Sequence, residues 1–149
     1  MSPGESKMGL YLIARIDQEI VALPATEIGS VVEVDQIAAV PRVPAHVAGL
    51  FALRSRVLTV IDTRASLELG AIDRDSDMTA VIVEHEGHSY ALLVDEVEDV
   101  IEASQPEPCP ALLPASWRRA AKGTIRHGEE AILLIDPAIV VAGPEPLAA

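Results

Sequence analysis

An internal repeat constrains the fold of this 149-residue chain more than any other feature. The segment from Gly49 to Asp62 aligns without a gap on the segment from Gly123 to Asp136, and both end in an apolar run followed by Ile-Asp. The preceding segments also align, with Leu23, Ala25, Ile28, Val31 and Val32 falling on Leu92, Val94, Val97, Val100 and Ile101. Each half therefore contains a hairpin, a strand, a loop, a helical turn and a final strand.

Many short strands separated by turns, repeated once, indicate two small antiparallel β-barrels. Half of the residues are hydrophobic but only 3% are aromatic, so the core must consist of Val, Ile, Leu and Ala, which favours sheets. We place the first barrel at residues 10–74 and the second at 75–142, with a polar junction at 71–77 and tails at 1–9 and 143–149. Barrels of this size bury little core alone, so each should depend on the other.

The segment from Pro44 to Arg64 predicts a helical turn, a glycine, a basic turn and a buried strand. Pro44 favours the start of a helical turn that Gly49 would end. Arg54 lies in the exposed turn, and residues 57–61 form the β-rich run. In the second half, we expect a helical turn at 115–122 that ends at Gly123 and a last strand that ends at Pro137; a short helix at 65–69 is also expected.

Charge and length exclude several functions. The net charge of −12 makes the chain a poor ligand for nucleic acid and for anionic lipid surfaces, although it does not exclude catalysis. No apolar run reaches the about 18 residues of a membrane span, and no basic-then-apolar leader is visible. The single cysteine, Cys109, allows no intrachain disulfide. Other proteins or small ligands remain as partners.

The signature segment resembles that of the CheW family of chemotaxis adaptors. That family typically has glycine, two variable residues, Asn-Leu-Arg-Gly, a strand that ends in Ile-Asp or Val-Asp, and Leu-Arg. The matching residues here are Gly49, Leu53, Arg54, Ile61, Asp62 and Arg64. The chain departs from the pattern at Ala52 (asparagine in the family), Ser55 (glycine) and Thr63 (leucine). The similarity extends from about Leu10 to Val141.

This resemblance implies a mainly β fold of two intertwined five-stranded SH3-like barrels with short helices. It implies a cytoplasmic, non-enzymatic scaffold without a cofactor, which couples methyl-accepting chemoreceptors to the histidine kinase CheA and joins membrane-bound receptor arrays through these partners. The kinase's regulatory domain would contact the signature turn, and the hairpin tip of the receptor would lie in the groove between the barrels. A CheW-like module of another two-component pathway, or a β-barrel that binds a small molecule in that groove, are the alternatives.

The resemblance also suggests site residues. The kinase-contact residues would be Arg54, Glu27, Phe51, Ala52 and Ser55, with Glu27 orienting Arg54 through an ion pair. From the residue type alone, a solvated surface arginine is the expected state of Arg54, and Phe51 could pack into the barrel. Ser55 matters if the turn needs a positive φ at that position.

The receptor-contact residues would be Ala25, Gly49, Ala91 and Val100, for which ordinary strand packing is the alternative. His85 and His88 flank a turn glycine, but a zinc site needs three or four ligands, so we expect no metal. Cys109 has no histidine nearby to activate it as a nucleophile. Asp62 and Asp136 are equivalent in the repeat, which explains them better as turn-forming residues than as an acid–base pair.

Overall fold

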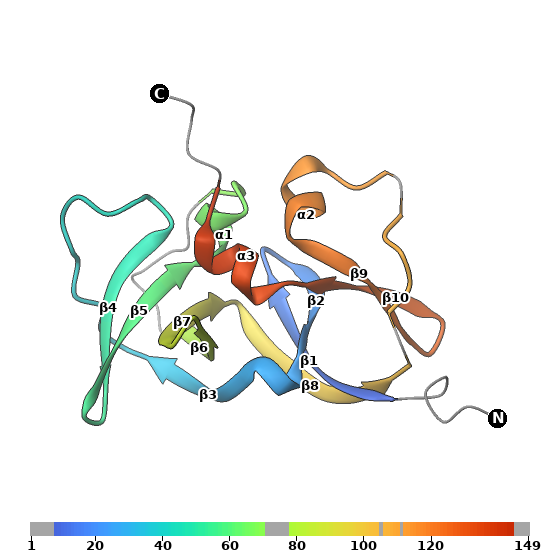
Figure 1. Ribbon diagram of the computed structural model, residues 1–149, viewed down its shortest axis with the longest axis horizontal. Coiled ribbons are helices and arrows are strands. Elements are labelled where there is room, and N and C mark those ends of the chain that lie inside the picture. Colours follow the sequence, from blue (N-terminus) through green and yellow to red (C-terminus); the bar gives the residue numbers. More distant parts are fainter. Residues whose placement is uncertain (1–7, 71–77, 105, 111, 145–149) are drawn as a thin grey trace.

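The computed structural model describes residues 8–70, 78–104, 106–110 and 112–144. The expected junction at 71–77 and most of both expected tails lie outside these residues. Sheet A contains, in spatial order, β8 (Glu96–Ala103), β1 (Gly9–Ile16), β2 (Glu19–Pro24), β10 (Glu130–Ile135) and β9 (Ala121–His127). Sheet B contains β3 (Ile28–Val34), β6 (Met78–His85), β7 (His88–Val94), β5 (Arg56–Asp62) and β4 (Val47–Leu53) (Figure 1). The expectation of a mainly β chain with two five-stranded units is confirmed.

Each sheet takes strands from both halves of the sequence. The hairpin β1–β2 of the first repeat lies between β8 and β10 of the second repeat, while the equivalent hairpin β6–β7 lies between β3 and β5. The exchange occurs through two parallel contacts, β10 with β2 and β5 with β7, and through two antiparallel contacts, β1 with β8 and β3 with β6. The boundary that we expected near residue 74 therefore divides the sequence repeat, but it does not divide the sheets.

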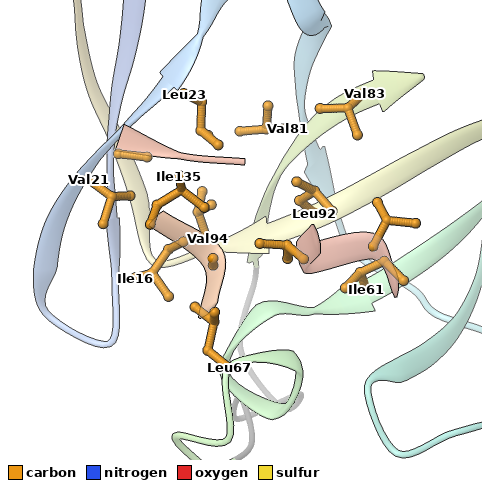
Figure 2. Packing of buried hydrophobic residues seen from close by; sticks show 14 of the residues in the cluster. Ile16, Val21, Leu23, Ile61, Leu67, Val81, Val83, Leu92, Val94 and Ile135 are labelled. Atoms are coloured by element: carbon orange, nitrogen blue, oxygen red, sulfur yellow. The ribbon is translucent and has the colours of Figure 1, made fainter. Parts of the chain in front are cut away.

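The strand exchange produces three apolar clusters. Because side chains alternate across a strand, β1 sends Leu12, Ala14 and Ile16 to one face and Tyr11 and Ile13 to the other. The first face joins a central cluster that both sheets share, in which Leu23, Val81, Leu92, Val94 and Ile135 meet (Figure 2). Each sheet also encloses a cluster of its own. Neither sheet can bury its central face without the other.

Short helices cover the central cluster on the upper side in Figure 1. They are α1 (Thr63–Ser66), α2 (Ala115–Ala120) and α3 (Pro137–Ala142), and α3 contacts both of the others. Asp62 caps α1 by accepting the N–H of Ala65, and Asp136 caps α3 by accepting that of Ala138. This supports the structural interpretation of the two aspartates.

The helical boundaries depart from expectation. Pro137 does not merely end β10, because it begins α3 at the first helical position, where its missing N–H costs nothing. The helix expected at 65–69 lies at Thr63–Ser66. The predicted helical turn at Pro44 is a single hydrogen-bonded turn, in which Val47 N–H donates to Pro44 O, and β4 then begins at Val47.

Gly49 and Gly123 do not end helices, which is the main correction to the expected elements. They lie inside β4 and β9 with φ of 148° and 152°, each beside a register shift in its hairpin. A Cβ on Gly49 would collide with the carbonyl oxygen of Ala38, and one on Gly123 with that of Glu107. Glycine is required because another strand segment crosses directly over the backbone, which is a tertiary contact and not a helix cap.

Three polar side chains fix the end of α3. His46 from the loop before β4, Ser66 from α1 and Arg119 from α2 all donate to carbonyl groups at the C-terminal end of this helix or just beyond it. Their acceptors are the carbonyl oxygens of Val141, Val140 and Gly143, at 3.0, 2.6 and 2.8 Å respectively. A helix leaves its last carbonyls without partners, so these contacts satisfy groups that burial would otherwise leave unpaired.

Candidate functional site

The β4–β5 hairpin presents Arg54 at its tip. Leu53 pairs with Arg56, so Arg54 and Ser55 are the two residues of the turn, and both are exposed. Arg54 has φ of 58°, in the left-handed region that costs a residue with a side chain about 1–2 kcal/mol. Within the described part of the chain, no hydrogen bond or ion pair holds its guanidinium. The side chain is therefore available to a partner.

The second repeat carries glycine at the equivalent position. Gly128 lies at the tip of the β9–β10 hairpin with φ of 65°. The two turns thus share a backbone conformation, and glycine is the residue that adopts it without strain. The fold therefore does not require an arginine at this position of the turn. Strained residues that persist in a protein often have a functional role.

Glu27 does not orient Arg54. It lies in η2 (Ala25–Glu27), and its carboxylate is 3.9 Å from the Nζ atom of Lys122 on β9. Both side chains are about two-fifths exposed, so this pair contributes little stability. The expected Arg54–Glu27 pair is therefore wrong, because the strand exchange places Glu27 beside the other sheet's hairpin.

Phe51 also differs from its expected role. It is only 8% exposed and belongs to the core of sheet B together with Leu58 and Val60. Alternation along β4 explains this, since Phe51 and Ala52 point to opposite faces and Ala52 is exposed. Ser55 is exposed as well, and the turn places its positive φ on Arg54, so serine causes no strain at that position. The structure brings Arg54, Ser55 and Ala52 together on the surface.

The four expected receptor-contact residues do not form one exposed group. Gly49 and Ala91 are buried in sheet B, and Ala25 is half-buried in η2. Val100 on β8 is 51% exposed. Direct contact with a partner is therefore open to Val100 and Ala25, whereas Gly49 and Ala91 can act only through packing.

Two further exposed apolar residues were missed in the sequence. Val31 on β3 is 41% exposed and is the repeat equivalent of Val100. Leu10 on β1 is 52% exposed, two residues from Leu12, which pairs with Val100. β3 and β8 are each one of the two edge strands of their sheets, and Figure 1 shows both along the lower side of the molecule; we call these two the outer strands. The repeat could have revealed Val31 once Val100 had been selected.

Arg64, another signature residue, has a structural role. It donates to Asp95 at 2.9 Å and lies 3.7 Å from Asp17, so it joins α1 to the β1–β2 turn and to the end of β7. The hydrogen bond to Asp95 raises the pKa of the Arg64 guanidinium, and burial opposes this only in part. On the exposed surface, Glu98 likewise raises the pKa of Arg15 by a hydrogen bond.

The described residues offer little to other chemistries. They contain no cluster of three or more His, Cys, Asp or Glu side chains that could hold a metal ion. Among the helices in these residues, none has the length and apolar character needed to span a membrane.

Two pseudo-equivalent five-stranded barrels, joined by exchanged hairpins and presenting an exposed basic turn, define the class of double-barrel interaction modules. The model of the CheW-like domain matches residues 10–144, and the chain therefore belongs to the CheW-like family. The fold is similar to that of the scaffolding protein TtCheW from Thermoanaerobacter tengcongensis, with a TM-score of 0.73 and 24% identity over 87% of this chain and 90% of that chain.

Curated relatives support the same family. The chemotaxis protein CheW of Treponema pallidum is 22% identical over 128 residues, which are 82% of this chain and 75% of that protein. The probable chemotaxis protein CheW of Rhizobium etli is 28% identical over 100 residues, 66% of this chain. That alignment spans 64% of the length of the Rhizobium etli protein.

Proposed function

We propose that this chain is a chemotaxis adaptor that couples methyl-accepting chemoreceptors to a CheA-type histidine kinase. It would act in the cytoplasm, held at receptor arrays by its partners. It would transmit a signal as a change in the relative geometry of these partners, without catalysing a reaction. The observation that carries the proposal is Arg54. The family's arginine is exposed and unpaired among the described residues, in a conformation that the second repeat fills with Gly128.

The kinase would bind the β4–β5 turn. An arginine presents a planar fork of donors that suits carboxylate groups of a partner, and the exposed residues Ala52 and Ser55 adjoin it. Phe51 supports this surface from the core and makes no contact of its own. Glu27 is assigned to its pair with Lys122 and does not enter the kinase contact.

A titration against the regulatory domain of the kinase tests this assignment. Arg54→Ala is expected to weaken binding by about 1–3 kcal/mol, roughly five- to more than a hundred-fold, as for an interface hot spot. Arg54→Lys should recover only part of the loss, because an ammonium group lacks the planar fork. Isothermal titration calorimetry gives the dissociation constants, and a melting curve of each variant shows that the fold is intact.

Arg126→Ala is the matched control, since Arg126 is an exposed arginine on the equivalent hairpin. It should bind the kinase domain as the wild type does. Equal affinities of the wild type and Arg54→Ala would remove Arg54 from the interface, and a wild type that does not bind at all would overturn the kinase half of the proposal.

The receptor would bind the exposed apolar residues of the outer strands. Val31 and Val100 occupy equivalent places on β3 and β8, and Leu10 adds apolar surface near Val100. Apolar side chains of this kind are suited to the apolar face of a helical hairpin. The double variant Val31→Ser, Val100→Ser should lose capture of a receptor cytoplasmic fragment but keep the kinase affinity.

Val57→Ser is the control for this pair, because Val57 is 66% exposed but lies on β5 beside the kinase turn. It should capture the receptor fragment normally. If the control and the double variant lose receptor binding equally, general loss of apolar surface explains the result and the outer strands are not a specific site.

A further inference from the structure

The outer edge of β4 is open next to the basic turn. β4 is the last strand of sheet B, and Ala38 is the one described residue that joins its outer edge. Ala38 and Leu50 exchange two hydrogen bonds, of 2.8 and 2.9 Å. On the Arg54 side of this bridge, residues 35–37 separate from β4 and leave an open cleft of about 550 Å³, lined by residues 35–38 and 50–52.

The register of the hairpin shows which backbone groups face this cleft. In an antiparallel pair, successive residues alternate between bonding to the partner strand and pointing away from it. Leu53 and Arg56 flank the two-residue turn and so bond to each other, which leaves Ala52 and Leu50 pointing outward. The bonds from Leu50 to Ala38 agree with this assignment. Ala52 therefore presents its N–H and C=O to the cleft.

The cleft carries charges of both signs, with the positive ones at the turn. Arg54 and Arg56 lie at the turn, and the guanidinium of Arg54 has no ion pair in the described residues. Asp35, which is exposed, lines the cleft and comes directly after β3. The two arginines outnumber this one carboxylate, so an acidic side chain of a bound segment is attracted to the turn, which favours an acidic residue at that end of the segment.

We propose that β4 binds an extended segment of a partner protein, which enters this cleft antiparallel to β4. Its main chain exchanges hydrogen bonds with the N–H and C=O of Ala52 and continues the ladder that Ala38 begins. An acidic side chain on the N-terminal side of the paired residue reaches Arg54. This is strand addition to a free sheet edge, in which the main chain gives affinity and side chains give specificity.

The dimensions of the cleft fit a short segment. Its volume lies within the range of about 300–1,000 Å³ that is typical of ligand sites. A strand advances about 3.3 Å per residue, so a few residues reach from the Ala38 bridge to the turn. The small side chain of Ala52 leaves the edge accessible. The proposal goes beyond the assignment of a kinase, because any partner with an exposed acidic strand satisfies it.

Amide hydrogen exchange of the free protein gives the first test. The Leu50 N–H, bonded to Ala38 O at 2.9 Å, should exchange slowly, and the Ala52 N–H should exchange rapidly. Protection of both amides would mean that residues 35–37 already pair with Ala52 in solution, and this would overturn the proposal.

The second test titrates the ¹⁵N-labelled protein with two synthetic hexapeptides, Glu-Glu-Thr-Val-Thr-Val and Lys-Lys-Thr-Val-Thr-Val. The acidic peptide should shift the Ala52 amide resonance and slow its exchange, and the basic peptide should bind at least ten-fold more weakly. No shift with the acidic peptide up to about 1 mM, which corresponds to a binding free energy of about −4 kcal/mol, would overturn the proposal.

Ala52→Pro removes the outward N–H without removing a bond to β5, since proline is tolerated at the open edge of a strand. Ala52→Pro should weaken binding of the acidic peptide at least ten-fold, and Arg126→Pro at the equivalent position of β9 should not.

A peptide with an N-methyl group at the paired valine removes the reciprocal donor and leaves the protein unchanged, so the test stands even if Ala52→Pro does not fold. Undiminished binding by both the variant and the methylated peptide would overturn strand addition. These peptides contain no part of a kinase, so this result is independent of the kinase titration.

Discussion

The β4–β5 and β9–β10 hairpins are built to the same plan, but their tips differ. Both hairpins have a glycine under a crossing segment, a register shift and an aspartate that caps the following helix. At the tips, Arg54 and Arg56 of the first hairpin correspond to Gly128 and Glu130 of the second. What the hairpins share is required for the fold. The arginines are not, because the second hairpin keeps the same backbone without them.

The connections that precede these hairpins also differ. The connection between β3 and β4 has 12 residues, whereas that between β8 and β9 has 17 and includes α2. The longer connection contributes Trp117, which is buried in the central cluster. The shorter one ends at His46, which occupies the place of Ala120 and bonds to the end of α3. The second connection thus supplies an extra apolar group together with the polar link of Arg119, whereas the first supplies only the polar link of His46.

The largest expected effect concerns the shared glycines. Gly49→Ala and Gly123→Ala should each lower the free energy of unfolding by about 2–5 kcal/mol, because both introduce a left-handed strain and a collision with a backbone carbonyl. Urea denaturation followed by circular dichroism measures the loss. Gly29→Ala is the control, since its Cβ would lie 3.7 Å from the nearest atom and its φ is not positive. A large loss at one shared glycine and none at the other would break the equivalence of the hairpins.

The next effect tests the difference between the connections. Arg119 on α2 donates to the carbonyl oxygens of Gly143 and Ser66. Arg119→Ala should destabilise the protein by about 1–3 kcal/mol, because partly buried carbonyl groups lose their partner. Thermal unfolding measures the change. Arg118→Ala, at the exposed neighbouring position, should cost less, and equal losses for the two variants would show that the link to α3 is unimportant.

The smallest effect tests the tips themselves. The two tip residues can be exchanged one at a time. Arg54→Gly should leave the free energy of unfolding unchanged or raise it by up to about 1 kcal/mol, and Gly128→Arg should lower it by about 1 kcal/mol. Chemical denaturation of both variants gives the two values. If Arg54→Gly instead destabilises the protein by more than about 1 kcal/mol, then Arg54 is a structural residue and the turn is not free for a partner.

Arg54→Gly also sharpens the functional comparison. Kinase binding should fall as it does for Arg54→Ala, although the fold is no less stable. A residue with only a structural role would not lower affinity while preserving stability. Stability and affinity that change together would therefore contradict the assignment of Arg54 to the interface.

Local pattern identified most strands but not the two that carry the signature glycines. β4 follows a proline-containing loop and β9 follows α2 directly, and their glycines resemble helix stops when they are considered alone. Only the crossing of Ala38 over Gly49, and of Glu107 over Gly123, shows why glycine is needed. The same limitation affected the site. The sequence correctly placed Arg54, Ala52 and Ser55 at the surface, but it could not show that Phe51 faces the core or that Glu27 meets Lys122.

The sequence by itself determined the repeat, the β-rich composition, the structural role of Asp62 and Asp136, and the family to which the chain belongs, because these depend on residue type and spacing. The tertiary structure alone decided that the hairpins β1–β2 and β6–β7 are exchanged between the sheets. The physical reason is that β2 and β7 are equivalent apolar strands, so either could pair with β5 or with β10. The choice depends on how the complete chain buries its central cluster, and a local pattern contains no information about that choice.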